Sequence, residues 1–148
     1  MRGSKFKGGF KSNGVKFEVR DDGLYKLNKN KKMYEKIPDK NMTKSEKLSV
    51  NNIKKLAEEK DIKTQLGKWT SEILDEEAKA RKYDNMKSVR TYTGYPNIYQ
   101  KECVELALWS SNSWYVLETI EEKVLNGSIK INNKEELKAQ LPAFNPSV

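Results

Sequence analysis

The feature that most constrains the fold of this chain is the Gly94-Tyr95-Pro96 turn, which separates two long segments of helical periodicity. Apolar side chains recur at three- and four-residue steps over residues 64–91, and again over residues 97–126. Proline lacks the amide hydrogen that a helix needs, and glycine adopts turn conformations readily, so the helical pattern is expected to stop there. The two segments therefore predict a helical hairpin.

Two shorter helices are expected to pack on this hairpin. Thr43 and Glu46 have the spacing of a capping box, which predicts a helix that begins near residue 43. Asn133 can cap a last helix over residues 134–141. Together with the hairpin, these elements predict a helical domain over residues 42–148.

The first 41 residues have a different pattern. Residues 1–14 contain four glycines, which favours a flexible arm over a regular element. Residues 15–19 and 24–27 alternate apolar and polar side chains around Asp22-Gly23, which predicts a small β-hairpin. The polar residues that follow, up to residue 41, are expected to be a linker. The protein is thus predicted to be mainly α: a helical hairpin with two shorter packed helices, preceded by a basic arm and a small β-hairpin over residues 1–41.

The composition excludes several kinds of chemistry. The chain has no histidine and a single cysteine, Cys103, which excludes an internal disulfide, a Cys/His zinc site and a histidine general base. Acidic pairs such as Glu58-Glu59 lie among lysines on polar helix faces, where the raised pKa values of catalytic carboxyl groups are not expected. We therefore expect a non-enzymatic protein with no catalytic residues, no cofactor and no metal.

No membrane partner is expected either. The sequence lacks a run of about 18 apolar residues, the length that a membrane-spanning helix needs. Its N-terminal residues also lack the apolar segment of a signal peptide. Synthesis and folding in a cytoplasm is the resulting expectation.

The positive charge is concentrated at the beginning of the chain. Residues 1–40 hold 12 Lys and Arg against 5 Asp and Glu, whereas residues 41–148 hold 17 against 16. Such asymmetry points to an acidic partner, although a lysine-rich segment that is only solvated remains the alternative. Aromatic anchors between the lysines favour docking on a neighbouring protein subunit, and stacking on unpaired bases of a nucleic acid is the second interpretation. The candidate docking residues are Lys5, Phe6, Lys7, Phe10, Lys11, Lys16 and Phe17.

A second candidate group lies in the most apolar segment. Trp109, Trp114 and Tyr115 come close together, and the segment is apolar on more than one side. Two interpretations follow: these rings form the core of the hairpin, or another protein chain covers one side.

The order of residues from Ala78 to Phe144 resembles a helical C-terminal module of tailed-bacteriophage proteins from the tail-fibre and baseplate region. The resemblance rests on order and spacing rather than on one motif. The matching residues are Ala80-Arg81-Lys82-Tyr83-Asp84-Asn85-Met86, Ser88 and Thr91-Tyr92, then Tyr95-Pro96-Asn97, Glu102, Ala107, Trp109, Trp114 and Tyr115, and finally Gly127, Glu135-Glu136-Leu137 and Leu141-Pro142-Ala143.

The resemblance implies a bacteriophage virion structural protein of the tail, baseplate or fibre-attachment region, and it brings no catalytic residues. Its partners would be other virion proteins, with several copies in a symmetric assembly, and the basic N-terminal segment would anchor it to a neighbouring subunit. Two alternatives stay open: a tail-fibre assembly factor that is absent from the mature virion, and a small DNA-binding phage protein that uses residues 1–40.

The tyrosines of the matching region flank the predicted turn. Tyr83 and Tyr92 precede it, and Tyr95 and Tyr99 lie in or after it. Their rings can close the open end of the helical hairpin as a structural clasp, with Asp84 as a hydrogen-bond partner. A glycan- or partner-binding patch on the same tyrosines is the alternative.

Overall fold

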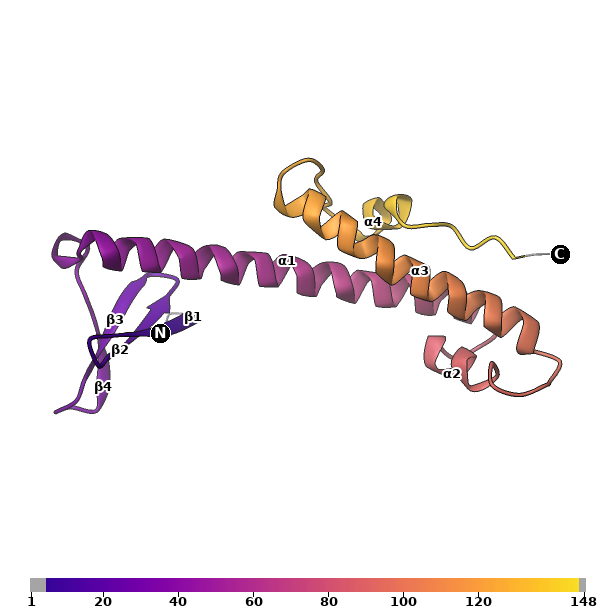
Figure 1. The fold of residues 1–148 in the computed structure, drawn as a ribbon, viewed down its shortest axis with the longest axis horizontal. Helices are drawn as coiled ribbons and strands as arrows, with labels where there is room; N and C mark the ends of the chain where they lie inside the picture. The colour runs from indigo at the N-terminus through magenta and orange to yellow at the C-terminus, as the bar shows by residue number, and fades with distance from the viewer. Residues whose placement is uncertain (1–4, 147–148) are drawn as a thin grey trace. The chain divides into compact units, whose positions relative to one another are not determined.

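The computed structural model describes residues 5–146 of the chain, which divides into two compact units, Met1–Asp61 and Ile62–Val148 (Figure 1). Of the described residues, 56% are helical and 16% lie in strands. The prediction of a mainly α protein with only a small hairpin was therefore wrong, because the first unit contains a four-stranded sheet and the fold is mixed α/β.

The sheet of the first unit is an antiparallel meander with strand order β1-β2-β3-β4. Four residue pairs between the second and third strands, including Val19 opposite Leu24, confirm the predicted hairpin. The expected flexible arm is largely strand, and the expected linker contains another strand; residues 1–4 of the arm lie outside the described residues. The strands are β1 (Phe6–Ser12), β2 (Val15–Arg20), β3 (Gly23–Asn28) and β4 (Met33–Lys36).

The additional hairpin between β1 and β2 turns at Asn13-Gly14. Both residues have a positive φ, 53° and 77°. This conformation is typical of a two-residue hairpin turn and is favoured by an Asn-Gly sequence. A short 3₁₀ turn, η1 (Asp39–Asn41), then leads into helix α1 (Lys44–Ala80).

The first half of α1 covers one face of the sheet. The buried core of the first unit consists of Phe17, Val19 and Leu24 from the strands together with Val50 from the helix. Gly8 lies so close to the helix that a Cβ atom there would come 2.7 Å from Cγ2 of Ile53. The glycine of β1 therefore allows a close approach between strand and helix, rather than keeping the segment irregular.

The helix α1 is continuous, although the sequence predicted two helices with a break near residues 57–63. No glycine or proline interrupts that stretch, and Ala, Glu and Lys are strong helix formers, so its charge does not end the helix. The end lies at Ala80 rather than near residue 90. Lys82 has a φ of 73°, and the amide of Tyr83 donates to the carbonyl of Ala78, which is the hydrogen bond of a Schellman motif.

In the second unit, the rest of α1 packs against α2 (Met86–Thr91), α3 (Gln100–Leu125) and α4 (Lys134–Gln140). Two neighbouring clusters of buried side chains form its core. One cluster contains Leu66, Ile73, Leu117, Ile120, Leu137 and Leu141, and the other contains Leu74, Ala78, Met86, Val89, Cys103 and Leu106.

Two of the predicted helix starts are confirmed by their caps, whereas α1 has no start near residue 64 and α3 begins at Gln100 without a side-chain cap. The amide of Glu46 donates to Oγ1 of Thr43, and the amide of Thr43 donates to the Glu46 carboxylate, which completes the predicted capping box. Asn133 accepts a hydrogen bond from the amide of Glu136 and so caps α4 as predicted.

Candidate functional site

The candidate docking residues of the first unit lie on both faces of its sheet. Phe10 and Phe17 are opposite each other on β1 and β2, and their rings stack at a centroid distance of 4.9 Å. Phe17 belongs to the buried core cluster that includes Val50 of α1, and the partly buried Phe10 packs against this cluster. The rings of Phe10 and Phe17 therefore pack the sheet against the helix, and they do not form part of an exposed basic surface.

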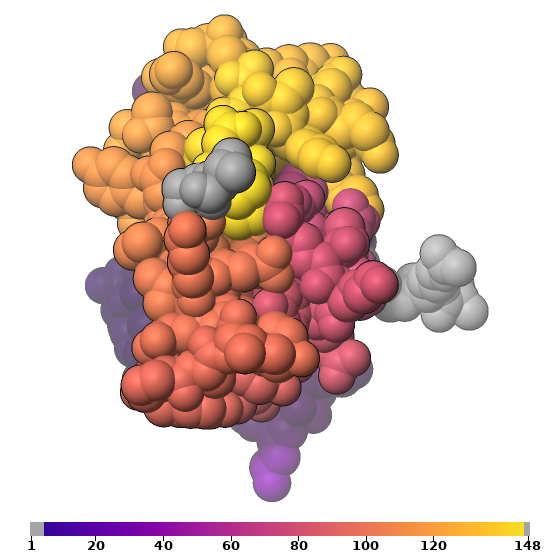
Figure 2. All heavy atoms as spheres, turned by 90° about the vertical axis from the view of Figure 1, so that its right-hand side faces the viewer, coloured from indigo at the N-terminus to yellow at the C-terminus, as the bar shows by residue number. Residues whose placement is uncertain are grey.

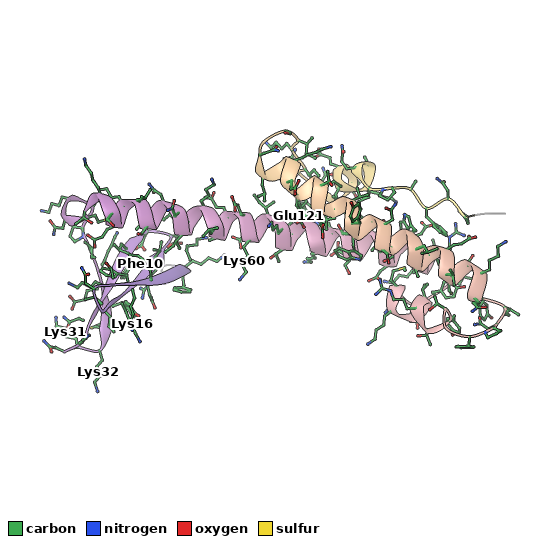
Figure 3. All side chains as sticks on the ribbon, in the orientation of Figure 1. Phe10, Lys16, Lys31, Lys32, Lys60 and Glu121 are labelled. Atoms are coloured by element: carbon green, nitrogen blue, oxygen red, sulfur yellow. The ribbon has the colours of Figure 1, made fainter. Side chains whose placement is uncertain are left out.

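The opposite face of the sheet is basic. Side chains alternate between faces along a strand, so the residues next to Phe17 and Val19 point away from the core. Lys16 is exposed there and lies directly across from Lys11, which is exposed as well. Figure 3 labels Lys16 on β2 and Phe10 on β1. We call Lys11, Lys16, Arg20 and Lys36, with the aromatic residue Tyr25 among them, the basic sheet face.

The charges of the basic sheet face are only partly balanced by acidic groups. Arg20 forms an ion pair with Glu18 at 3.0 Å, and its guanidinium lies over the Tyr25 ring, 4.0 Å from the centroid. Lys36 lies 3.8 Å from Asp22. Lys11 and Lys16 form no ion pair with any residue from 5 to 146. Like charges directly opposite each other destabilise a sheet, so this pair of lysines favours binding of an external acidic group.

The remaining candidates of the arm lie at the first strand. Phe6 is 58% exposed and lies opposite Arg20. Lys7 falls where the register between β1 and β2 shifts by one residue, and it is half-buried. The amide of Lys5 donates to the carboxylate of Asp21, so this residue is tied to the turn between β2 and β3.

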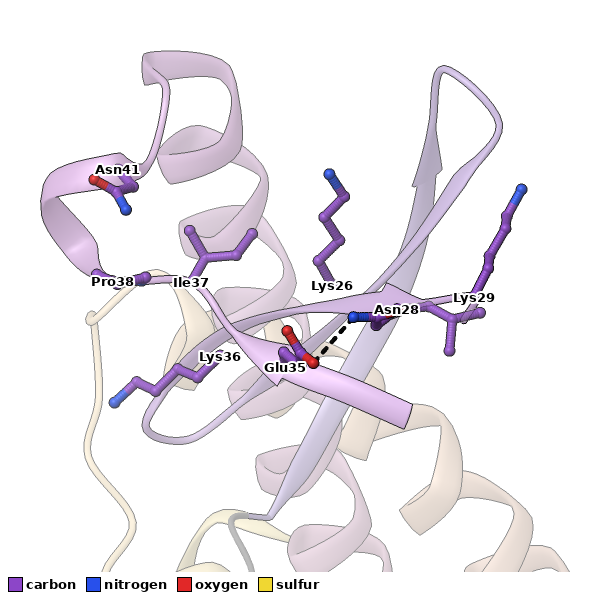
Figure 4. A pocket seen from close by; sticks show the side chains of 9 residues that line it. Lys26, Asn28, Lys29, Glu35, Lys36, Ile37, Pro38 and Asn41 are labelled. Carbon is purple, nitrogen blue, oxygen red and sulfur yellow. Dashed lines mark hydrogen bonds between the residues drawn. The ribbon is translucent and has the colours of Figure 1, made fainter. Parts of the chain in front are cut away.

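A hollow of about 470 Å³ lies at the end of β3 and β4 in the same unit (Figure 4). Lys26, Lys29 and Lys36 line it, and Nδ2 of Asn28 donates to the Glu35 carboxylate across its floor at 3.1 Å. Lys36 belongs to the basic sheet face as well, and Lys26 and Lys29 extend the positive charge of the first unit beyond it. Among residues 5–146, no group of three or more histidine, cysteine or acidic side chains could hold a metal ion.

In the second unit, three of the four tyrosines of the turn region form one group of rings. The centroid of Tyr83 lies 6.2 Å from that of Tyr92 and 6.3 Å from that of Tyr99, and Tyr92 lies 5.5 Å from Tyr99. We call these residues the tyrosine cluster. Tyr95 is half exposed and makes no ring contact with any residue from 5 to 146, and Asp84 is exposed.

The hydroxyl of Tyr83 anchors the tyrosine cluster to α3. It donates a hydrogen bond of 2.8 Å to the Glu102 carboxylate, which also lies 3.4 Å from the Arg81 guanidinium. Burial raises the pKa of Tyr83 far above its usual value, and hydrogen bonds with Cys103 and Glu102 raise it further. The hydroxyl therefore remains protonated and serves as a structural donor.

The tryptophan of the first half of α3 is fixed by the C-terminal segment. Nε1 of Trp109 donates to the carbonyl of Pro142 at 2.8 Å, and the Trp109 ring lies 5.4 Å from that of Phe144. The Arg81 guanidinium also lies over the Phe144 ring, 4.5 Å from its centroid. Trp114 and Tyr115 differ from Trp109, because they are 38% and 72% exposed.

Two features of these surfaces were not predicted from the sequence. The pairing of Lys11 with Lys16 depends on the β1–β2 hairpin, for which Asn13-Gly14 was an available signal. The contacts of the Glu102 carboxylate with Tyr83 and Arg81 could not be predicted from a local sequence pattern, because both partners precede Glu102 by about 20 residues.

Comparison of the chain with family models, with curated proteins and with solved structures gives no match. None of the helices in the described part of the chain is long and apolar enough to cross a membrane.

Proposed function

We propose that the protein is a non-enzymatic structural component of a bacteriophage virion, in the region of the tail, baseplate or fibre attachment. The first unit anchors it to a neighbouring virion subunit through the basic sheet face. The second unit is the folded body, and several copies are arranged by the symmetry of the particle.

The contacts among the residues that carry the resemblance are the main support for this proposal. Tyr83 bonds to Glu102, and Trp109 bonds to Pro142, so residues far apart in the matching order meet within one unit. The residues that carry the resemblance therefore belong to one folded body, which is what a structural role of the second unit requires.

The two facing lysines support the anchoring part of the proposal. Lys11 and Lys16 lie opposite each other on exposed sheet positions, and neither has an acidic partner among the described residues. An acidic surface on a neighbouring subunit would relieve their repulsion, and complementary charges also guide two subunits into register.

The first experiment is quantitative mass spectrometry of gradient-purified particles, compared with the crude lysate. A fixed ratio to the major tail proteins is the expected result. Presence in the lysate alone would contradict a structural role and would favour an assembly factor that leaves before maturation.

A second experiment tests the basic sheet face. The double substitution Lys11→Glu with Lys16→Glu is expected to abolish incorporation into particles while the protein stays folded. The matched control is Lys60→Glu with Lys68→Glu, which makes the same charge change at two exposed positions of α1. Equal incorporation of the two double variants would contradict anchoring through the sheet.

Nucleic acid is the second candidate partner for the same face. Arg20, Lys16 and the exposed ring of Phe6 combine positive charge with an aromatic surface, as single-strand binding proteins do. Fluorescence anisotropy with labelled single- and double-stranded DNA distinguishes this function. Binding that weakens steeply as salt rises and disappears in the Lys11→Glu, Lys16→Glu variant would favour it over subunit docking.

A further inference from the structure

The helix α3 has a second apolar side that no other part of the described chain covers. Its buried side, which includes Leu106 and Leu117, faces the core of the second unit. On the opposite side Val104, Leu108 and Tyr115 are 36%, 66% and 72% exposed. They are spaced by four and seven residues, so they form one line over about three helical turns. We call these three residues the α3 stripe.

The alignment of these side chains distinguishes the α3 stripe from an ordinary exposed residue. Single exposed apolar residues are common on protein surfaces, but a line that includes a large aromatic ring is typical of an interface. Beside Leu108 lies a shallow hollow of about 460 Å³, lined also by Asn112, Pro142 and Phe144. In Figure 2 the orange residues of α3 lie next to the yellow C-terminal segment, which supplies part of the lining of this hollow. The stripe thus has both a protruding ring and a hollow.

The two ends of the α3 stripe carry opposite charges. Lys101 lies one turn before Val104, and Glu122 lies two turns after Tyr115, on the same side of the helix. Both charged side chains are exposed. At the middle of the stripe, Ser111 and Asn112 are small enough to let another helix approach closely. When a second α3 runs in the opposite direction, the positive end of each stripe therefore meets the negative end of the other.

We propose that the α3 stripe binds the α3 stripe of a second copy of the chain, with the two helices antiparallel. A two-fold axis between Ser111 and Asn112 places Leu108 opposite Tyr115 and Lys101 opposite Glu122, twice in each dimer. The ring of Tyr115 from one copy then covers Leu108 and the adjoining hollow of the other. A parallel pair is less favourable, because it would place Lys101 beside Lys101 and Glu122 beside Glu122.

A contact of this size gives a weak dimer. Few residues of each copy take part, which is typical of small, transient interfaces with dissociation constants of about a micromolar or weaker. Pairing by α3 requires only residues of the second unit, and it holds whether or not the protein is a virion component.

Sedimentation velocity of the full chain, from micromolar to submillimolar concentration, measures this equilibrium. The wild-type protein is expected to shift from monomer to dimer, and Leu108→Glu is expected to weaken dimerisation by roughly tenfold or more. The matched control is Leu56→Glu, since Leu56 of α1 is 64% exposed and lies outside the stripe. Far-ultraviolet circular dichroism confirms that each variant is folded.

A charge exchange tests the antiparallel register. Lys101→Glu and Glu122→Lys are each expected to weaken the dimer, because each places like charges at both symmetric contacts. The double variant in one chain is expected to restore wild-type dimerisation, since each contact is then reversed rather than broken.

Three results would overturn the proposal. One is a wild-type chain that stays monomeric over the whole concentration range, which would indicate that a different protein binds the α3 stripe. Another is equal dimerisation of the Leu108→Glu and Leu56→Glu variants. The third is a double charge variant that is no better than the single ones, which would exclude the antiparallel register.

Discussion

At the scale of single residues, Tyr83 connects three segments of the second unit. It follows the end of α1, its hydroxyl bonds to Glu102 of α3, and its ring contacts those of Tyr92 and Tyr99. A bond to a carboxylate is stronger than one between neutral groups, because the acceptor is charged. This hydroxyl is therefore expected to contribute more to stability than those of the other tyrosines in the turn region.

Replacing Tyr83 by phenylalanine tests that expectation. The change keeps the ring and removes the donor to Glu102, so the free energy of unfolding is expected to fall by about 1 to 2 kcal/mol. Urea denaturation followed by tryptophan fluorescence measures the difference. The control is Tyr95→Phe, because the Tyr95 ring is half exposed and outside the tyrosine cluster, and it should leave stability unchanged.

The raised pKa of Tyr83 gives a second prediction at this scale. Its folded-state pKa lies above the ordinary value of 10.0, so the unfolded chain loses this proton first as pH rises. The contribution of the hydroxyl is thus fully present below pH 10 and is lost as pH rises towards the folded-state pKa. The stability difference between wild type and Tyr83→Phe should be constant up to about pH 10 and shrink above it. A difference that shrinks already between pH 7 and 9 would contradict this.

The candidate functional residues differ in how well the sequence alone predicts their positions in the structure. Exposure of Lys11 and Lys16 follows from strand alternation once the hairpin is recognised. The position of Phe10 depends on which residue of β2 it faces, and that register is set by the Asn13-Gly14 turn and by the shift near Lys7. The α3 stripe has the same periodicity as the buried side of the helix, so periodicity alone does not tell which side is covered.

At the scale of elements, the sequence predicted where structure begins better than where it continues. Capping residues act through neighbours three positions away, and both Thr43 and Asn133 were recognised for that reason. The continuity of α1 and the strand β1 depend instead on distant partners. Charge near residue 60 predicts a break and the glycines of β1 predict flexibility only when the packing around them is left out.

The contact between β1 and α1 makes Gly8→Ala a test of this packing. The new Cβ would lie 2.7 Å from Cγ2 of Ile53, so strand or helix must shift, at a cost of about 1 to 3 kcal/mol. Chemical denaturation of the full chain, followed by circular dichroism, measures the loss. Adding Ile53→Ala removes the clashing methyl group and should reverse part of the effect.

Another glycine provides the control for Gly8. Gly67 lies inside α1, and a Cβ there would meet no atom within 4 Å. Gly67→Ala is expected to stabilise the protein by roughly 0.5 to 1 kcal/mol, because alanine loses less conformational freedom in a helix. The two substitutions should therefore change stability in opposite directions.

At the scale of the whole molecule, each of the two units has a core of its own. The residues of both clusters of the second unit, from Leu66 to Leu141, follow the boundary at Asp61. The core residues of the first unit all precede Asp61, and the last of them in the sequence are Val50 and Ile53. The helix α1 supplies side chains to both cores, and among residues 5–146 no buried cluster contains residues of both units.

This division predicts that residues 62–148 fold without the first unit. A fragment of that length should show the circular dichroism of a helical protein and a single cooperative transition on heating. A shorter fragment beginning at Asn85 lacks the α1 residues Leu66, Ile73, Leu74 and Ala78 and should not fold. An unfolded 62–148 fragment would show that the first unit is required for stability.

The burial of Cys103 has a practical consequence for labelling. It is the only cysteine of the chain, it is fully buried, and its thiol lies against Tyr83, so reagents that attack exposed thiolates will leave it unmodified. A cysteine introduced on the surface would then be the single reactive thiol, and the native residue need not be replaced. Spin labels or fluorophores can be placed one site at a time, at Thr119 or Lys16, to record distances between copies or contact with a partner.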